Sequence, residues 1–304
     1  MADLILHHYD ASPYAEKIRL ILGYKGLPWK SVKIPRIMPK PDLMPLTGGY
    51  RRTPVLQIGA DIYCDTERIA GELERRHPTP TLFAQSEGLS RVIGNWVAMS
   101  FFGPAAFFVI GSNADQLPME FHEDRAAMRG RKADVAASKA NAPRFRERVR
   151  AQLAWLESML SDGREFLLGD KASLADFSAY HPVWFILRNG FGQDLAPFPK
   201  VSAWARRVEQ FGHGRPEELD SKQALRIARE STPAAAGKVD AQDRSGLKAG
   251  DKVAITAEDT GRDPVVGVLV SSSANEIAIL REDETVGEVA VHFPRVGYDV
   301  RRVE

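Results

Sequence analysis

A serine hydroxyl stands where a helix is expected to begin, in the segment Ser12-Pro13-Tyr14. Proline suits the first turn of a helix because its missing N–H is one of the groups that the helix leaves unpaired there. The remaining N–H groups and the helix dipole favour a negative charge, to which a hydroxyl can donate a hydrogen bond. Lowering the pKa of a bound thiol by about two units would require only about 2.7 kcal/mol of preferential thiolate binding. Taken alone, Ser12 is more simply explained as an N-cap residue.

A second candidate segment is Thr53-Pro54-Val55. The residue before a proline favours extended geometry, and a cis bond at Pro54 would turn backbone polar groups toward solvent. An extended peptide could then pair with this backbone as a neighbouring strand does. The alternative is an ordinary trans proline at the start of a strand.

A third candidate is the pair Asp65-Thr66, which opens another predicted helix. A helix N-terminus with a hydroxyl can hold a carboxylate, and the Asp65 side chain can receive an amino group. Together they suit an amino-acid head group. A plain helix cap is again the simpler explanation for the pair in isolation.

These segments lie at the ends of predicted elements in a small α/β domain. Hydrophobic periodicity predicts a strand at residues 4–8, a helix to Tyr24, a strand at 29–34, a hairpin at 55–64 and a helix to about Arg76. A proline-rich loop separates the second strand from the hairpin. We expect this domain to span residues 1–78.

The rest of the chain divides into a helical and a β-rich part. Residues 86–230 show helical periodicity, with helices expected at 89–99, 145–160, 177–187, 201–211 and 216–229 and a polar, irregular or helical excursion at 112–142. Ser173-Leu174-Ala175-Asp176 forms a capping box before one of them. Residues 231–245 are predicted to be a flexible linker. Short β-branched runs at 253–255, 265–270, 277–280 and 286–293 predict a small antiparallel barrel or sandwich at 246–304.

Composition excludes several classes of function. The net charge is +1, which gives no global field for nucleic acid or an anionic membrane. The single cysteine, Cys64, permits neither an intrachain disulfide nor a cysteine-rich metal site, and His7 and His8 lack partners at ligand spacing. The apolar stretch 101–110 is short for a membrane span and Gly103-Pro104 interrupts it, and no signal peptide is evident. We therefore expect a cytoplasmic protein without a bound metal.

The order and spacing of four segments resemble the glutathione S-transferase superfamily. These segments are Ser12-Pro13-Tyr14, Arg52-Thr53-Pro54-Val55, Asp65-Thr66-Glu67-Arg68-Ile69 and Ser173-Leu174-Ala175-Asp176. The resemblance covers residues 3–230 and implies a thioredoxin-like N-terminal domain followed by the helical C-terminal domain of that family. The predicted β-domain lies outside it.

The resemblance also implies roles for individual residues. Ser12 would be the thiol-activating hydroxyl, as in the serine-type classes. Pro54 would be the cis-proline of the family, and the backbone of Val55 would pair with the cysteinyl part of glutathione. Asp65 and Thr66 would hold the γ-glutamyl group. Tyr14, Thr53 and Arg52 belong to the same segments, and Arg52 stands where several classes place a cation for the glycyl carboxylate.

Some alternatives remain open from the sequence. Tyr9 could compete with Ser12, because the tyrosine-type classes use a tyrosine near the end of the first strand. Counted without gaps, however, that tyrosine falls nearer His8, so Ser12 remains the predicted residue. Position 12 is not cysteine, which disfavours glutaredoxin-like reduction, and Cys64 is expected to be a buried structural residue. Aromatic residues at 101, 102, 107 and 108 could line a pocket for an apolar electrophile or simply form core.

Two functions follow as hypotheses. The first is a homodimeric glutathione transferase that activates the glutathione thiol for attack on an apolar electrophile. The second is a non-catalytic binding or scaffold protein that acts through its C-terminal β-domain, since fold alone does not fix function.

Overall fold

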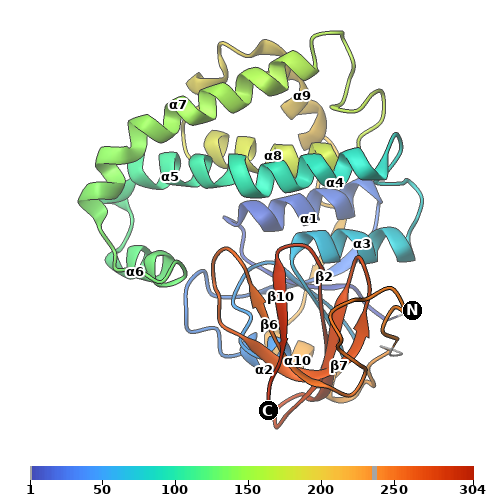
Figure 1. The fold of residues 1–304 in the computed structure, drawn as a ribbon. Helices are drawn as coiled ribbons and strands as arrows, with labels where there is room; N and C mark the ends of the chain where they lie inside the picture. The colour runs from blue at the N-terminus through green and yellow to red at the C-terminus, as the bar shows by residue number, and fades with distance from the viewer. Residues whose placement is uncertain (1, 235–237) are drawn as a thin grey trace.

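The computed structural model describes residues 2–234 and 238–304 (Figure 1). Its N-terminal domain has the predicted order of elements, with one additional short helix in the proline-rich loop. The elements are β1 (Ile5–His8), α1 (Pro13–Tyr24), β2 (Pro28–Lys33), α2 (Met44–Thr47), β3 (Val55–Ile58), β4 (Asp61–Cys64) and α3 (Thr66–Arg76). Strand β1 runs parallel to β2 and antiparallel to β3, which pairs with β4. This arrangement confirms the predicted thioredoxin-like domain.

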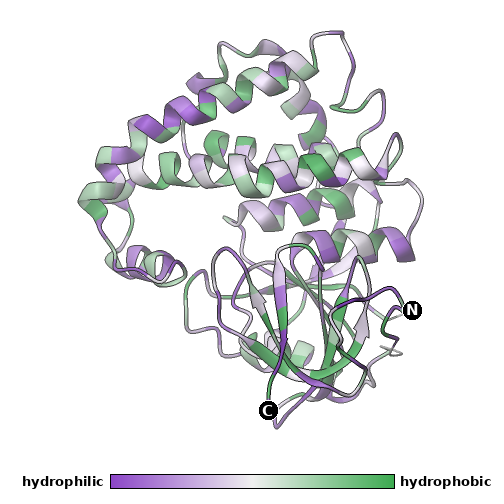
Figure 2. Cartoon of the chain, in the orientation of Figure 1, coloured by the Kyte–Doolittle hydropathy of each residue, from purple (hydrophilic) through white to green (hydrophobic). Residues whose placement is uncertain are grey.

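The second domain is helical, as predicted. Its helices are α4 (Glu87–Trp96), α5 (Phe102–Ser112), α6 (Met119–Ala127), α7 (Val135–Met159), α8 (Leu174–Arg188) and α9 (Pro199–Glu209). The capping box at the start of the buried helix α8 is present. Figure 2 shows many hydrophilic residues on the outer helix α7, whereas α5 beneath it is mostly hydrophobic.

Two helices in this domain are longer than the sequence predicted. Helix α7 begins at Val135 and contains Pro143. Together, α6 and the start of α7 make more than half of the segment 112–142, predicted to be an irregular or helical excursion, helical. A π-helical segment, Val97–Phe101, joins α4 to α5 and makes one helix of Glu87–Ser112. By length and hydropathy alone this helix could cross a membrane, contrary to the expectation for its apolar stretch, but Phe101 and Phe108 lie in the core of the helical domain.

The segment after α9 returns to the N-terminal domain. Residues 216–229 were predicted to be one helix, but they contain strand β5 (Arg215–Glu218) and helix α10 (Ser221–Arg229). Strand β5 pairs in parallel with β2 and forms the edge of the sheet. Pro216 has no backbone N–H to donate, which an edge strand tolerates. The side chain of Gln57 in β3 donates to the carbonyl oxygen of Ala224 in α10 at 2.8 Å.

The C-terminal residues form an antiparallel sheet that continues the N-terminal one. Its strands are β6 (Lys252–Ala257), β7 (Val265–Ser272), β8 (Ile277–Asp283), β9 (Gly287–Phe293) and β10 (Tyr298–Arg302), of which β10 was not predicted. Strand β9 pairs in parallel with β4, so one ten-stranded sheet has the order β10-β6-β7-β8-β9-β4-β3-β1-β2-β5. Part of the predicted linker, residues 235–237, lies outside the described residues.

The β-domain and the thioredoxin-like domain also share a hydrophobic core. Buried side chains of β1, β3 and β4 and of helix α10 belong to the same cluster as those of β6 to β9. Phe293 and Val291, for example, are fully buried together with Val55 and Ile62. We therefore describe the C-terminal strands as an extension of the first domain and its core, rather than as a body tethered by a linker.

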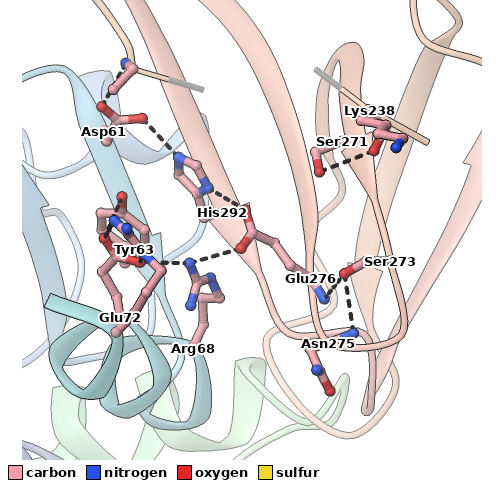
Figure 3. A network of polar contacts seen from close by, with 12 residues as sticks. Asp61, Tyr63, Arg68, Glu72, Lys238, Ser271, Ser273, Asn275, Glu276 and His292 are labelled. Atoms are coloured by element: carbon pink, nitrogen blue, oxygen red, sulfur yellow. Dashed lines mark hydrogen bonds and ion pairs between the residues drawn. The ribbon is translucent and has the colours of Figure 1, made fainter. Parts of the chain in front are cut away.

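A buried polar network crosses the junction between β4 and β9 (Figure 3). Nε2 of His292 lies 2.9 Å from Oδ1 of Asp61. Nδ1 of the same imidazole lies 2.7 Å from Oε1 of Glu276. Arg68 of α3 pairs with Glu276 at 2.7 Å, and the ring of Tyr63 stacks on the imidazole. Burial alone would lower the pKa of His292, but the hydrogen bonds and charges of the two carboxylates outweigh burial and raise it.

Candidate functional site

Ser12 occupies the N-cap position of α1, as the sequence predicts. Its backbone is extended, and its Oγ accepts a hydrogen bond from the N–H of Ala15 at 3.2 Å. The residue is only 2% exposed. Within the described ranges 2–234 and 238–304, no hydrogen bond has this hydroxyl as its donor. The hydrogen of Ser12 is therefore available to an acceptor at the positive end of α1.

Two tyrosines flank this serine. The hydroxyl of Tyr9 accepts from Arg125 of α6 at 3.4 Å, so it faces the helical domain. The ring of Tyr14 packs on Phe102 and His181, with ring centroids 4.5 and 4.6 Å apart. Burial and the charge of Asp65 raise the pKa of Tyr14, so its phenol remains protonated at neutral pH.

The peptide bond between Thr53 and Pro54 is cis, as the family resemblance implies. Val55 follows as the first residue of β3, opposite Cys64 in β4 and His7 in β1. Cys64 is followed directly by Asp65-Thr66, so the second and third candidate segments lie next to each other in the sheet.

A lysine that the sequence reasoning missed lies beside this cis peptide. Nζ of Lys40 donates to Oγ1 of Thr53 and to the carbonyl oxygen of Arg51, both at 2.9 Å. Lys40 is 4% exposed, and no carboxylate pairs with it in the part of the chain that the structure describes. Burial, with repulsion from Arg125, lowers its pKa to about 8. The only signal in the sequence was a lysine within the proline-rich loop.

Asp65 and Thr66 lie at the start of α3, where the sequence places them. Oδ1 of Asp65 accepts from the N–H of Glu67 at 3.0 Å, and the residue has a φ of 72°, which is uncommon for a residue other than glycine. Oγ1 of Thr66 accepts from Nζ of Lys17 at 3.3 Å. Lys17 also pairs with Glu67 at 2.9 Å, so a cation and a helix N-terminus adjoin the Thr66 hydroxyl.

The C-terminal strands reach this same region. The hydroxyl of Tyr298, the first residue of β10, donates to Oδ2 of Asp65 at 3.0 Å. In the loop between β6 and β7, Asp259 and the carbonyl oxygen of Thr260 both bind the guanidinium of Arg52. Arg52, predicted as a cation for a carboxylate, thus already has an acidic partner. Tyr298 was missed because it lies in the strand that was not predicted.

The aromatic residues of α5 and of the π-helical segment before it lie in two different environments. Phe101 and Phe108 are fully buried in the helical core. Phe102 is half-buried against Tyr14, and Phe107 lies under the guanidinium of Arg129, 4.9 Å from its ring centroid. Of the four aromatic residues named from the sequence, Phe102 therefore lies beside the candidate site, against Tyr14, whereas Phe101 and Phe108 form core.

The remaining candidates have structural roles in this chain. Cys64 is buried and free, and burial raises the pKa of its thiol, which makes it a poor nucleophile. His7 bonds to Gln57 and His8 to Ser31, both within the sheet. No cluster of three metal-ligating side chains occurs among the described residues.

Comparisons with known proteins identify the family. Residues 6–81 match the family described as "Glutathione S-transferase, N-terminal domain", and residues 139–207 match "Glutathione S-transferase, C-terminal domain". A solved GST-like protein from Pseudomonas syringae is 41% identical, covers 100% of both chains and superposes with a TM-score of 0.78. FtsZ-localized protein A of Caulobacter vibrioides is 25% identical over 182 residues, which are 57% of this chain and 73% of that protein. S-crystallin 2 of Octopus vulgaris is 24% identical over 221 residues, 68% of this chain and 92% of that protein. The chain belongs to the glutathione S-transferase superfamily.

Proposed function

We propose that this protein binds glutathione across its N-terminal domain and ionises the thiol at Ser12 for attack on an apolar electrophile. The observation that carries the proposal is the Ser12 hydroxyl, which caps α1 through its oxygen and donates to no acceptor among the described residues. A thiolate at this point accepts that hydrogen bond and interacts with the positive end of the helix. Both interactions favour the ionised form of the thiol over the neutral one.

The rest of the tripeptide fits the neighbouring groups. The γ-glutamyl amino group pairs with the carboxylate of Asp65, and its carboxylate meets the N-terminus of α3 at Thr66. Because Val55 already pairs with β1 and β4, we assign the cysteinyl backbone to the main chain of Thr53, directly before the cis-proline. Because the guanidinium of Arg52 is held by Asp259, we assign the glycyl carboxylate chiefly to Lys40, a buried cation whose hydrogen bonds within the described residues go to neutral oxygens.

The chemical step needs little from the protein beyond position and charge. The thiol proton leaves to solvent, the thiolate lone pair forms a carbon–sulfur bond, and the leaving group departs with its bonding electrons. The electrophile would lie against Phe102 and Tyr14, where apolar rings exclude water. Holding both reactants there converts a bimolecular reaction into an effectively unimolecular one.

Isothermal titration calorimetry with glutathione tests the binding part of this proposal. We expect saturable binding, weaker binding of cysteinylglycine, which lacks the γ-glutamyl group, and weaker binding of γ-glutamylcysteine, which lacks the glycyl carboxylate. A panel of alkyl and aryl halides then tests the transfer reaction. Failure of glutathione itself to bind would contradict the proposal as a whole.

The second candidate is a non-catalytic binding protein that acts through its C-terminal strands. Its support is that two relatives of this chain, FtsZ-localized protein A and S-crystallin 2, carry names that are not those of transferases. The measurement that separates the two functions is the pKa of bound glutathione. Tight binding without a lowered thiol pKa would favour the binding protein.

We also propose that the protein forms a homodimer through the helical domain. Leu89, Val92 and Met99 lie along α4 and the π-helical segment with exposed fractions of 54–67%, and Trp155 of α7 is 57% exposed nearby, 6.1 Å from the ring of Trp96. Such a concentration of exposed apolar side chains is typical of an interaction surface. Light scattering of the wild type and of Val92→Glu tests this, because a charge there should yield monomers.

A further inference from the structure

The contact between Tyr298 and Asp65 joins residues that are 233 positions apart. Tyr298 opens strand β10 and pairs with Ala257 of β6, so the strand ladder fixes its backbone. Its ring packs against Phe293 with centroids 5.4 Å apart, and the residue is 4% exposed. The hydroxyl is therefore held in place by the C-terminal sheet and points at a carboxylate of the N-terminal domain.

This hydroxyl and a backbone N–H together orient the carboxylate. Oδ1 of Asp65 accepts from the N–H of Glu67 at 3.0 Å, while Oδ2 accepts from Tyr298. A carboxylate has about four acceptor positions, so two remain for another donor. Burial and the neighbouring charge of Asp65 raise the pKa of Tyr298, which keeps the phenol protonated as a donor.

The loop between β6 and β7 makes further contacts close to the candidate site. The N–H of Gly261, in the loop between β6 and β7, donates to the carbonyl oxygen of Met128 after α6 at 2.7 Å. The preceding residues Asp259 and Thr260 bind Arg52. The guanidinium of Arg52 also lies 5.9 Å from the ring centroid of Tyr298. The C-terminal part of the chain thus touches both the residue before Thr53-Pro54 and the residue before Thr66.

We propose that Tyr298 is a positioning residue for the γ-glutamyl end of glutathione, and that the C-terminal β-domain completes the glutathione site from within the same chain. This inference rests on the proposed function and adds to it a role for residues outside the two matched family domains. Tyr298 acts through Asp65: it fixes the carboxylate so that the free acceptor positions face an ammonium group. Removal of the phenol hydroxyl should therefore weaken recognition of that group and leave the sulfur chemistry intact.

The experiment is a double-mutant cycle on Tyr298→Phe and Asp65→Asn, read by calorimetry with glutathione. Tyr298→Phe keeps the ring against Phe293 and should weaken glutathione binding by about tenfold, as expected for a hydrogen bond to a charged group. In the Asp65→Asn background the same change should have no further effect, because the two residues act as one unit. The pKa of the bound thiol at saturating glutathione should not change in Tyr298→Phe.

The matched control is Tyr63→Phe. Tyr63 is also 4% exposed, and its hydroxyl also donates to a carboxylate, that of Glu72 at 3.3 Å, away from Asp65. This variant should bind glutathione as the wild type does. If the wild type binds glutathione and Tyr298→Phe binds it equally well, the inference is wrong and the proposed function stands. An equal loss of glutathione affinity on Tyr298→Phe in the wild type and in Asp65→Asn would also overturn the inference. If the wild type binds no glutathione, the proposed function itself is wrong.

Discussion

Nε2 of His292 lies 2.9 Å from Oδ1 of Asp61, although 231 positions separate the two residues. The contact lies at the junction where β9 continues the sheet from β4. The carboxylate of Glu276 lies beside the other ring nitrogen of His292, and Arg68 of α3 pairs with the same carboxylate (Figure 3). The imidazole of His292, held between two carboxylates that raise its pKa, thus links the C-terminal strands to the first domain.

The first prediction concerns the pH dependence of stability. Because the pKa of His292 is raised in the folded protein, its contribution is fully present below the unfolded value of about 6.5 and is lost as pH rises through the folded value. The difference in free energy of unfolding between the wild type and His292→Gln should therefore be largest in mild acid and shrink with rising pH. Denaturant titrations at a series of pH values measure this difference.

His7 serves as a control with the opposite sign. Burial lowers its pKa to about 4, so its contribution is present above about 6.5 and is lost as pH falls toward 4. The stability difference between the wild type and His7→Gln should shrink toward acid. Parallel pH profiles for the two variants would show that folding does not raise the pKa of His292.

The second prediction concerns the shared core. Removal of residues 246–304 exposes the edge of β4 and the apolar side chains of Val55 and Ile62 that pack with β9. We expect the full chain to unfold in one cooperative transition that includes the first domain and the β-domain, and the shortened chain to aggregate or melt at a lower temperature. Differential scanning calorimetry tests both. A shortened chain as stable as the full one would mean that the strands are an independent module.

The third prediction concerns the buried capping box of α8. Asp176 is fully buried and accepts from the N–H groups of Leu167 and Ser173 and from the indole of Trp204 at 2.8–2.9 Å. Burial raises its pKa, but every neighbour named here is a donor. Asp176→Asn places an NH₂ group against those donors and should destabilise the protein by about 3 kcal/mol.

Asp134→Asn is the matched control for this change. Asp134 caps α7 at an exposed position, and asparagine is an equally good N-cap residue. Its effect on the denaturant midpoint should be close to zero. Similar losses in the two variants would contradict the role assigned to the buried box.

The fourth prediction concerns Lys40. Its pKa of about 8 means that the ammonium group loses its proton as pH rises through that value, and with it the attraction for a carboxylate. Binding of γ-glutamyl-alanyl-glycine, which has no thiol to titrate, should weaken above about pH 8 more steeply in the wild type than in Lys40→Met. Lys33→Met, which removes an exposed lysine paired with Asp10, is the control and should follow the wild type. Identical pH profiles for Lys40→Met and the wild type would exclude Lys40 from the site.

Much of the first domain could be predicted because its signals are local. Ser12-Pro13 marks a helix start, and the short connection after Ile58 marks a hairpin, so the positions of Ser12 and Asp65 follow from nearby residues alone. The start of α7 was predicted poorly, although its end was not, because Pro143 and a polar, alanine-rich composition conceal the first part of a helix that packs against α5.

The contribution of the C-terminal strands could not be predicted for a different reason. The pairing of β9 with β4 joins segments more than 200 positions apart, and nothing local in Asp61 or His292 specifies the partner. Tyr298 begins a short strand whose following residues are mostly charged, so periodicity did not reveal it. Tyr298 and Lys40, which we propose for the site and which the sequence did not indicate, are both placed by contacts of this long-range or loop type.

The proposed function depends most directly on ionisation of the glutathione sulfur at Ser12. Its test is a titration of the thiolate absorbance of bound glutathione in the wild type, Ser12→Ala and Ser12→Thr. Ser86→Ala serves as the control, because the Ser86 hydroxyl caps α4 by an identical 3.2 Å bond to the third residue on. We predict a thiol pKa well below that of free glutathione in the wild type, in Ser12→Thr and in Ser86→Ala, and a return toward the free value in Ser12→Ala. A thiol that remains as acidic in Ser12→Ala as in the wild type would contradict the account.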